Sequence, residues 1–123
     1  MKVPILKLGD YLIASVQGAL TDADLLGLKN ELAEKVGRSR ARGVVVDVTV
    51  LDVMDSFSTR TLRDIAQVTR LRGTETVIAG IQPDVAFTMV QLGLGLEGVS
   101  TSLDLEEGLA YLENRLEADK RDR

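Results

Sequence analysis

Residues 43–49 decide the fold class, and they read Gly43-Val44-Val45-Val46-Asp47-Val48-Thr49. β-Branched residues dominate this run, and apolar and polar residues do not alternate along it. Such a run predicts a central strand that is buried on both faces of a sheet. A strand of this kind belongs to a parallel or mixed sheet with helices packed over it. We therefore expect an α/β domain.

Two strands and a helix are expected before this central strand. The apolar runs Ile5–Leu8 and Tyr11–Val16 are separated by Gly9 and Asp10, which predicts a hairpin. A helix then follows, since Thr21 and Asp24 form a variant of the capping box. Its apolar face has helical spacing and consists of Leu25, Leu28, Leu32 and Val36. Arg38, Arg40 and Arg42 form a basic cluster, which suits the C-terminal end of this helix. Gly43 comes next and is a plausible residue to follow the helix.

The chain beyond the central strand continues the alternation of helices and strands. The expected elements are a helix over Phe57–Leu71, a strand over Thr76–Ala79, a helix that begins at Pro83, a strand over Val99–Ser102 and a helix that begins after Asp104. The charged tail, residues 117–123, is expected to fray. The order is ββαβαβαβα, so we predict one domain over residues 1–123, with a mixed sheet covered by about four helices.

The composition excludes several classes of function. The chain of 123 residues has no cysteine and no histidine, so it lacks thiol chemistry and the commonest general base and metal ligand. Its net charge of −4 and its few aromatic residues argue against binding to nucleic acid or anionic lipid. We expect no cofactor, no bound metal, no signal peptide and no membrane span, and hence a cytoplasmic protein.

A glycine motif and a group of aspartates need separate interpretation. Residues 93–98 match the G-x-G-x-x-G pattern, but they follow a helix and precede a strand, the reverse of a dinucleotide site. Asp47, Asp52 and Asp55 lie around one strand end and could bind magnesium. A small magnesium-dependent phosphohydrolase is therefore an alternative, although a structural role for the three carboxylates in the loop is favoured.

The connection after the central strand is the most informative segment, and it reads Asp52-Val53-Met54-Asp55-Ser56-Phe57-Ser58-Thr59. Ser56 is expected at the N-cap of the next helix, where a hydroxyl accepts a hydrogen bond from a free backbone N–H. A helix N-terminus also accommodates a phosphate group. Ser56 is therefore a candidate for both roles. A partner would bind by apolar contact with Met54 and Phe57 beside Asp55, and phosphorylation would expel it.

At this segment the chain resembles the STAS domain family of bacterial anti-sigma-factor antagonists. The resemblance rests on three consecutive features: a strand that ends in an acidic residue, a short loop, and Asp55-Ser56 at the start of a helix. The resemblance extends over the full length of the chain. It is strongest to the stressosome scaffold subtype of the family, and three further segments carry it: Pro4-Ile5-Leu6-Lys7-Leu8, Gly80-Ile81-Gln82-Pro83 and residues 103–109. Many members read Asp-Ser-Ser/Thr-Gly, whereas here Phe57 and Ser58 follow Ser56. Ser58 is thus a second candidate acceptor and Thr59 a weaker third.

The resemblance implies a function and a set of partners. It implies a non-catalytic scaffold that sequesters an RsbT-like serine/threonine kinase through Met54, Asp55, Ser56 and Phe57, and releases it when Ser56 is phosphorylated. The implied partners are an RsbR-like STAS paralogue, the RsbT-like kinase, an RsbX-like phosphatase and further copies of the chain. A simple two-partner anti-sigma-factor antagonist is an alternative within the same family.

Overall fold

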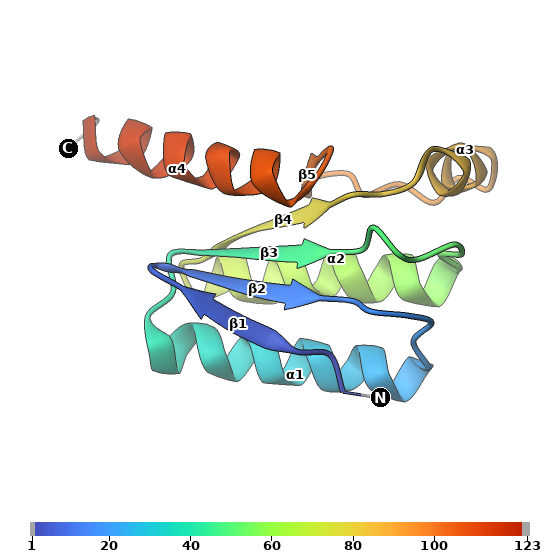
Figure 1. Cartoon of the computed structure of the whole chain (residues 1–123), viewed down its shortest axis with the longest axis horizontal. Helices are drawn as coiled ribbons and strands as arrows, with labels where there is room; N and C mark the ends of the chain where they lie inside the picture. The colour runs from blue at the N-terminus through green and yellow to red at the C-terminus, as the bar shows by residue number, and fades with distance from the viewer. Residues whose placement is uncertain (1, 122–123) are drawn as a thin grey trace.

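The computed structural model describes residues 2–121, which fold around one five-stranded sheet (Figure 1). The elements are β1 (Ile5–Leu8), β2 (Tyr11–Ser15), α1 (Asp22–Ser39), β3 (Gly43–Asp47), α2 (Ser56–Leu71), β4 (Glu75–Ala79), α3 (Pro83–Gln91), β5 (Ser100–Ser102) and α4 (Leu105–Arg121). The strand order is β1-β2-β3-β4-β5, with β1 antiparallel to β2 and the other pairs parallel. The predicted order and mixed sheet are confirmed.

The central position of residues 43–47 is also confirmed. In β3, Val45 lies opposite Ile13 of β2 and Val77 of β4, and Val44, Val45 and Val46 have no exposed surface. Because β2, β3 and β4 run parallel, the segments that follow them emerge at the same end of the sheet. We call this the carboxyl end, and the opposite one the amino end.

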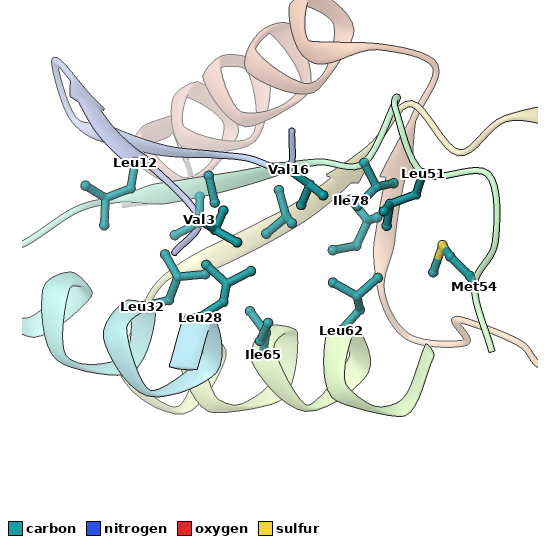
Figure 2. Close-up of a cluster of buried hydrophobic side chains, with 14 of the residues drawn as sticks. Val3, Leu12, Val16, Leu28, Leu32, Leu51, Met54, Leu62, Ile65 and Ile78 are labelled. Atoms are coloured by element: carbon teal, nitrogen blue, oxygen red, sulfur yellow. The ribbon is translucent and has the colours of Figure 1, made fainter. Parts of the chain in front are cut away.

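Helices form a layer on each face of the sheet. On one face, α1 and α2 pack side by side and bury the larger core, which Figure 2 shows. Leu28 and Leu32 of α1 and Leu62 and Ile65 of α2 are each no more than 3% exposed there. On the other face, α4 packs over β3, β4 and β5, and Leu112 is fully buried against Val45 and Val77. The β3–α2 connection is therefore anchored by a packed strand and a packed helix.

One expectation about a helix end was wrong, and another is not tested. We expected residues 117–123 to fray; α4 is helical to Arg121, and residues 122–123 lie outside the described part of the chain. Glutamate, alanine and lysine favour helix, and basic residues suit a helix C-terminus. Gly43 does not follow α1 directly, because Arg40 takes the left-handed conformation at its C-cap (φ 53°). Gly43 instead begins β3, where a Cβ atom would lie 2.8 Å from Leu112 Cδ1.

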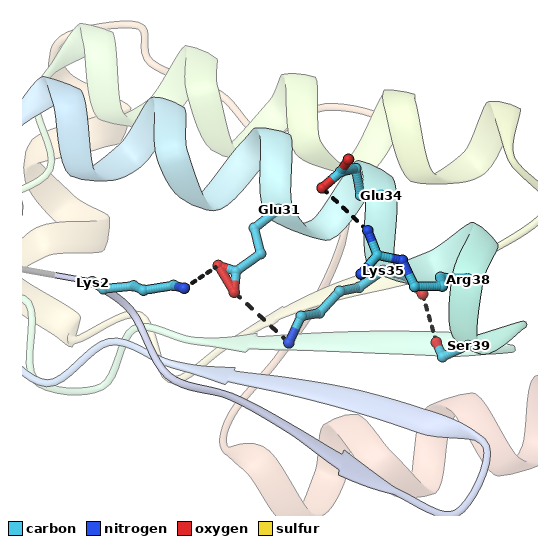
Figure 3. A network of polar contacts seen from close by, with 6 residues as sticks. All are labelled: Lys2, Glu31, Glu34, Lys35, Arg38 and Ser39. Atoms are coloured by element: carbon cyan, nitrogen blue, oxygen red, sulfur yellow. Dashed lines mark hydrogen bonds and ion pairs between the residues drawn. The ribbon is translucent and has the colours of Figure 1, made fainter.

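The outer surface of α1 carries a small network of charges (Figure 3). Glu31 lies 3.7 Å from the Nζ of Lys2 and 3.8 Å from that of Lys35, and Arg38 pairs with Glu34 at 3.6 Å. Exposed pairs of this kind contribute about 0–1 kcal/mol each. Glu31 nevertheless links the N-terminal segment to α1.

Between residues 2 and 121, no helix combines the length and the apolar character that crossing a membrane requires.

Replacing Gly27 with alanine is expected to stabilise the fold. Gly27 lies inside α1, and a Cβ atom added there would have no heavy atom within 4 Å. Alanine favours a helix interior over glycine by about 1 kcal/mol, so the free energy of unfolding in urea should rise by about that amount. Gly108→Ala, inside α4, is the control and should gain less, because a Cβ atom there would lie 3.0 Å from the Ser102 Oγ and 3.5 Å from the Val45 Cγ1. An equal gain in both variants, or none at Gly27, would contradict this account.

Candidate phosphorylation and partner-binding site

The N-terminus of α2 is capped by Asp55, not by Ser56 as we expected. The Asp55 carboxylate Oδ1 accepts a hydrogen bond from the backbone N–H of Ser58 at 2.8 Å, and its backbone is extended (φ −83°). Aspartate and serine are both favoured at this position, so the sequence alone left the choice between neighbours open. Ser56 is the first residue of the helix. The structural and the proposed regulatory roles therefore fall on different side chains.

The Ser56 side chain is free to react. Ser56 is exposed, and its hydroxyl takes part in none of the hydrogen bonds found among residues 2–121. The first turn of α2 contains no acidic residue, whereas acidic residues occupy the first turns of α1, α3 and α4. A phosphate on Ser56 would therefore meet the positive end of the helix dipole without a carboxylate inside that turn.

The two other candidate acceptors differ in access. Ser58 is partly buried, and its backbone N–H is used by the Asp55 cap. Thr59 is only 1% exposed, and its hydroxyl donates to the Asp55 carbonyl oxygen at 2.9 Å. Thr59 is therefore the least accessible of the three candidate acceptors. Ser58 stays a second candidate, less accessible than Ser56.

Met54, which we expected to be exposed as a partner contact, lies in the core. Met54 is 3% exposed, and its side chain packs with Leu51 and Leu62 in the larger core (Figure 2). The adjacent Val53 is 75% exposed instead. Val53 and Met54 are neighbouring apolar residues in the loop, and packing decides which one turns inward. Phe57 is partly exposed, as a partner contact requires.

A hollow of about 310 Å³ lies beside this loop. It separates the β2–α1 connection from the β3–α2 connection, and its lining is mostly apolar. Leu20 and Leu25 line one side, and Val50, Val53 and Ser58 line the other. The hollow could receive an apolar side chain of a partner next to Ser56. Sequence reasoning missed it, because its two sides are about 30 residues apart along the chain.

The three aspartates do not form a metal site. Asp47 Oδ1 accepts hydrogen bonds from the Thr49 backbone N–H at 3.0 Å and from the Thr49 hydroxyl at 2.5 Å. Asp55 caps α2, and Asp52 lies 3.4 Å from Gln82 Nε2. Among residues 2–121, no group of three or more acidic side chains could hold a metal ion. The magnesium-dependent phosphohydrolase therefore loses its basis, and the carboxylates organise the loop.

The start of α3 fixes the far side of the same loop. Gln82 Nε2 donates to the Thr49 carbonyl oxygen at 2.7 Å. Gly80 precedes it with a positive φ of 82°, and a Cβ atom there would lie 3.2 Å from the Thr49 Cα. The β3–α2 and β4–α3 connections thus pack closely, which holds the loop before Ser56 in place.

The sequence model of the STAS domain family matches residues 2–108. The chain belongs to the STAS domain family. This STAS domain is similar to a solved variant of RsbS from Moorella thermoacetica in which a glutamate replaces a serine. The two are 36% identical, the match covers 95% of this chain and 99% of that one, and the TM-score is 0.82. A chain from a structure of the stressosome, described as a signal integration and transduction hub, is 37% identical over 92% of this domain and 98% of that chain, with a TM-score of 0.76.

The RsbT co-antagonist proteins to which this STAS domain is similar are longer proteins. The RsbT co-antagonist protein RsbRA of Bacillus subtilis (strain 168) is 30% identical over 82 residues, which are 67% of this chain and 30% of RsbRA. RsbRD of the same organism is 25% identical over 89% of this chain and 40% of its own length. The STAS domain thus spans about a third of the length of the curated relatives it matches. The resemblance found in the sequence is confirmed.

Removing the Asp55 cap is expected to destabilise this STAS domain in a pH-dependent way. Hydrogen bonds from Ser58, first from its backbone N–H and then from its side chain, hold the pKa of Asp55 below its usual range. Asp55→Ala should cost about 1 kcal/mol of unfolding free energy at neutral pH. Because the folded pKa is the lower one, the charge contributes above the unfolded value of about 3.9 and is lost as pH falls through the folded pKa.

Asp55→Asn is the matched variant for this measurement, since asparagine keeps the capping oxygen and removes the charge. Urea unfolding between neutral pH and pH 2 should show the wild type slightly more stable than Asp55→Asn at neutral pH. That difference should shrink in acid. A difference that stays constant over this range would mean that the carboxylate charge has no part in the cap.

Proposed function

We propose that this STAS domain is a non-catalytic regulator that binds an RsbT-like serine/threonine kinase and releases it when Ser56 is phosphorylated. The observation that carries the proposal is the exposed, unbonded hydroxyl of Ser56 at the start of α2. The similarity to RsbS over nearly the whole of both chains supports it. So does the similarity to RsbRA, whose name describes an RsbT co-antagonist.

The proposed release is electrostatic. The phosphate group adds about −1.5 to −2 charges at neutral pH. It would lie beside Asp55 and Asp52, which already make this surface acidic. A partner that is in apolar contact with the surface would have to desolvate these charges, and the cost would favour dissociation.

The proposed contact surface for the kinase consists of Asp55, Ser56 and Phe57. We propose that the exposed Val53 provides the apolar contact in place of the buried Met54. The adjoining hollow supplies an apolar recess next to Ser58. Interfaces commonly combine an apolar anchor in a recess with a polar rim. The kinase is therefore proposed to insert one apolar side chain there, next to the serine that it phosphorylates.

The wider assembly is part of the same proposal. Similarity to RsbRA and RsbRD makes RsbR-like STAS paralogues the proposed assembly partners. Similarity to a chain of the stressosome structure supports assembly into a larger particle, together with further copies of this chain. A phosphatase of the RsbX type is proposed to reset Ser56. A two-partner anti-sigma-factor antagonist would form no such particle, and size-exclusion chromatography with an RsbR-like partner separates the two possibilities.

The site assignment is tested by incubating the chain with its RsbT-like kinase and ATP, followed by mass spectrometry. The wild type should gain one phosphate within the peptide that contains Ser56. Ser56→Ala should lose at least about 90% of the label, because Ser58 is partly buried and its N–H is used in the cap. Ser58→Ala is the matched control and should keep the label. Full labelling of Ser56→Ala would overturn the assignment.

A further inference from the structure

The amino end of the sheet carries a cluster of arginines without ion-pair partners. They come from the α1–β3 connection, the end of α2 and the second half of α4: Arg40, Arg42, Arg70, Arg72 and Arg115. All five are exposed, and none takes part in the ion pairs found among residues 2–121. We call these five residues the basic end. Guanidinium groups form bidentate hydrogen bonds with carboxylates, so the cluster is suited to binding acidic side chains.

The basic end contains a recess and an apolar contact point. Arg42, Arg70 and Arg115 line a hollow of about 210 Å³, with Glu75 as its acidic lining residue. Glu75 accepts a hydrogen bond from the Ser100 hydroxyl at 2.8 Å. Leu71 lies between Arg70 and Arg72 in the chain and is 88% exposed, the highest fraction for a large apolar residue among residues 2–121. An exposed leucine next to charged residues is unfavourable in water and favourable in a protein interface.

The opposite end of α4 is complementary. Leu103 is 75% exposed, and acidic residues follow it at the carboxyl end of the sheet: Asp104, Glu106 and Glu107. We call these four residues the acidic corner. It lies at the N-terminal end of α4, whereas Arg115 and Leu116, which line the hollow, belong to the second half of that helix. Each end therefore presents one exposed leucine beside a group of like charges. Arginines predominate at the basic end, where Glu75 lines the hollow and the Asp10 carbonyl oxygen accepts a hydrogen bond from the Arg42 N–H at 2.8 Å.

We propose that the basic end binds the acidic corner of a second copy of this chain, so that copies associate head to tail. Leu103 of one copy would contact Leu71 of the next, while Glu106 enters the hollow between Arg42 and Arg115. Such an interface joins two different surfaces, so each copy can bind one copy at each end. The copies then form a closed ring or an open chain. Ser56 belongs to neither surface, because it lies at the opposite end of α2 from Leu71 and in the helix layer opposite α4, which begins within the acidic corner. The inference rests on the proposed association of copies of this chain and not on the proposed kinase function.

The test uses two variants of the full chain, each with one end altered. The basic-end variant is Arg42→Glu with Arg115→Glu, and the acidic-corner variant is Leu103→Ser with Glu106→Gln, so that the two altered surfaces do not attract each other. In low-salt buffer, sedimentation velocity should show concentration-dependent association of the wild type. It should show at least about tenfold weaker association of each variant alone. An equimolar mixture should form a dimer and nothing larger, because each variant keeps one intact surface and the two surfaces match.

Several outcomes would overturn this proposal. They are a wild type that stays monomeric at all concentrations, association of either variant at wild-type strength, and a mixture that does not form the dimer. Raised salt should weaken wild-type association, since the exposed charges are then screened. Arg42→Gln with Arg115→Gln removes the charges without reversing them, and it should weaken association less. Circular dichroism verifies the fold of every variant. Failure here would leave Ser56 labelling unaffected, so the two proposals are distinguishable.

Discussion

Ser56→Asp is expected to weaken binding of the RsbT-like kinase at least about tenfold, which corresponds to about 1.4 kcal/mol. The added carboxylate would lie in the proposed interface beside Asp55 and would lose its hydration when the kinase binds. Ser56→Ala should bind as tightly as the wild type, because the hydroxyl makes no hydrogen bond within the described chain. Isothermal titration calorimetry with each purified variant measures the effect.

Asn30→Asp is the matched control for charge. Asn30 is exposed on α1, so the substitution adds the same single charge away from the proposed interface. Kinase affinity should stay within about twofold of the wild type, because exposed charges more than about 10 Å apart are largely screened at ordinary ionic strength. If Asn30→Asp and Ser56→Asp lower the affinity equally, net charge and not the site controls binding. If neither lowers it, the proposed mode of release is wrong.

Gly80→Ala is expected to cost about 2–4 kcal/mol of unfolding free energy, the largest single effect that we expect on stability. Gly80 has φ of 82°, and alanine in the left-handed region costs about 1–2 kcal/mol. The new Cβ atom would also collide with the Thr49 hydroxyl and lie 3.2 Å from the Thr49 Cα. Thr49 would have to move, and its hydrogen bonds to Asp47 would be disturbed. The remainder of the cost comes from this displacement.

Gly73→Ala separates the two causes. Gly73 has nearly the same φ, 84°, but a Cβ atom there would have no heavy atom within 4 Å. Urea unfolding should therefore show about 1–2 kcal/mol for Gly73→Ala, which is the backbone cost alone. The excess at Gly80 measures the close approach of the two connections. Equal costs at both glycines would show that the contact with Thr49 has no energetic consequence.

The sequence determined the architecture where burial leaves little choice. Residues 43–47 are apolar on both sides, so they had to lie between two helix layers, and the pattern sufficed to predict β3. The apolar stripe of α1 predicted the buried face of that helix correctly for the same reason, and its members are all buried: Leu25, Leu28, Leu32 and Val36. In these segments, periodicity and burial report the same physical constraint.

The site was predicted less well, because loops obey weaker local rules. The neighbours Asp55 and Ser56 are equally good caps, and the choice depends on how the preceding loop enters the helix. Met54 and Val53 could exchange places in any local pattern, and only the available space beneath the loop selects Met54. The hollow depends on two connections that meet only in the folded chain. Such features require tertiary contacts, which a single sequence does not display.

The assignment of the cap to Asp55 has a consequence for how the chain tolerates change. The Asp55 carboxylate caps the helix, and the neighbouring Ser56 hydroxyl forms none of the hydrogen bonds found among residues 2–121. If Ser56 is phosphorylated as proposed, its modification would therefore carry no penalty to folding. Such a reversible signal would leave the domain intact through many cycles, because adding and removing the phosphate group would change only the surface that a partner protein contacts.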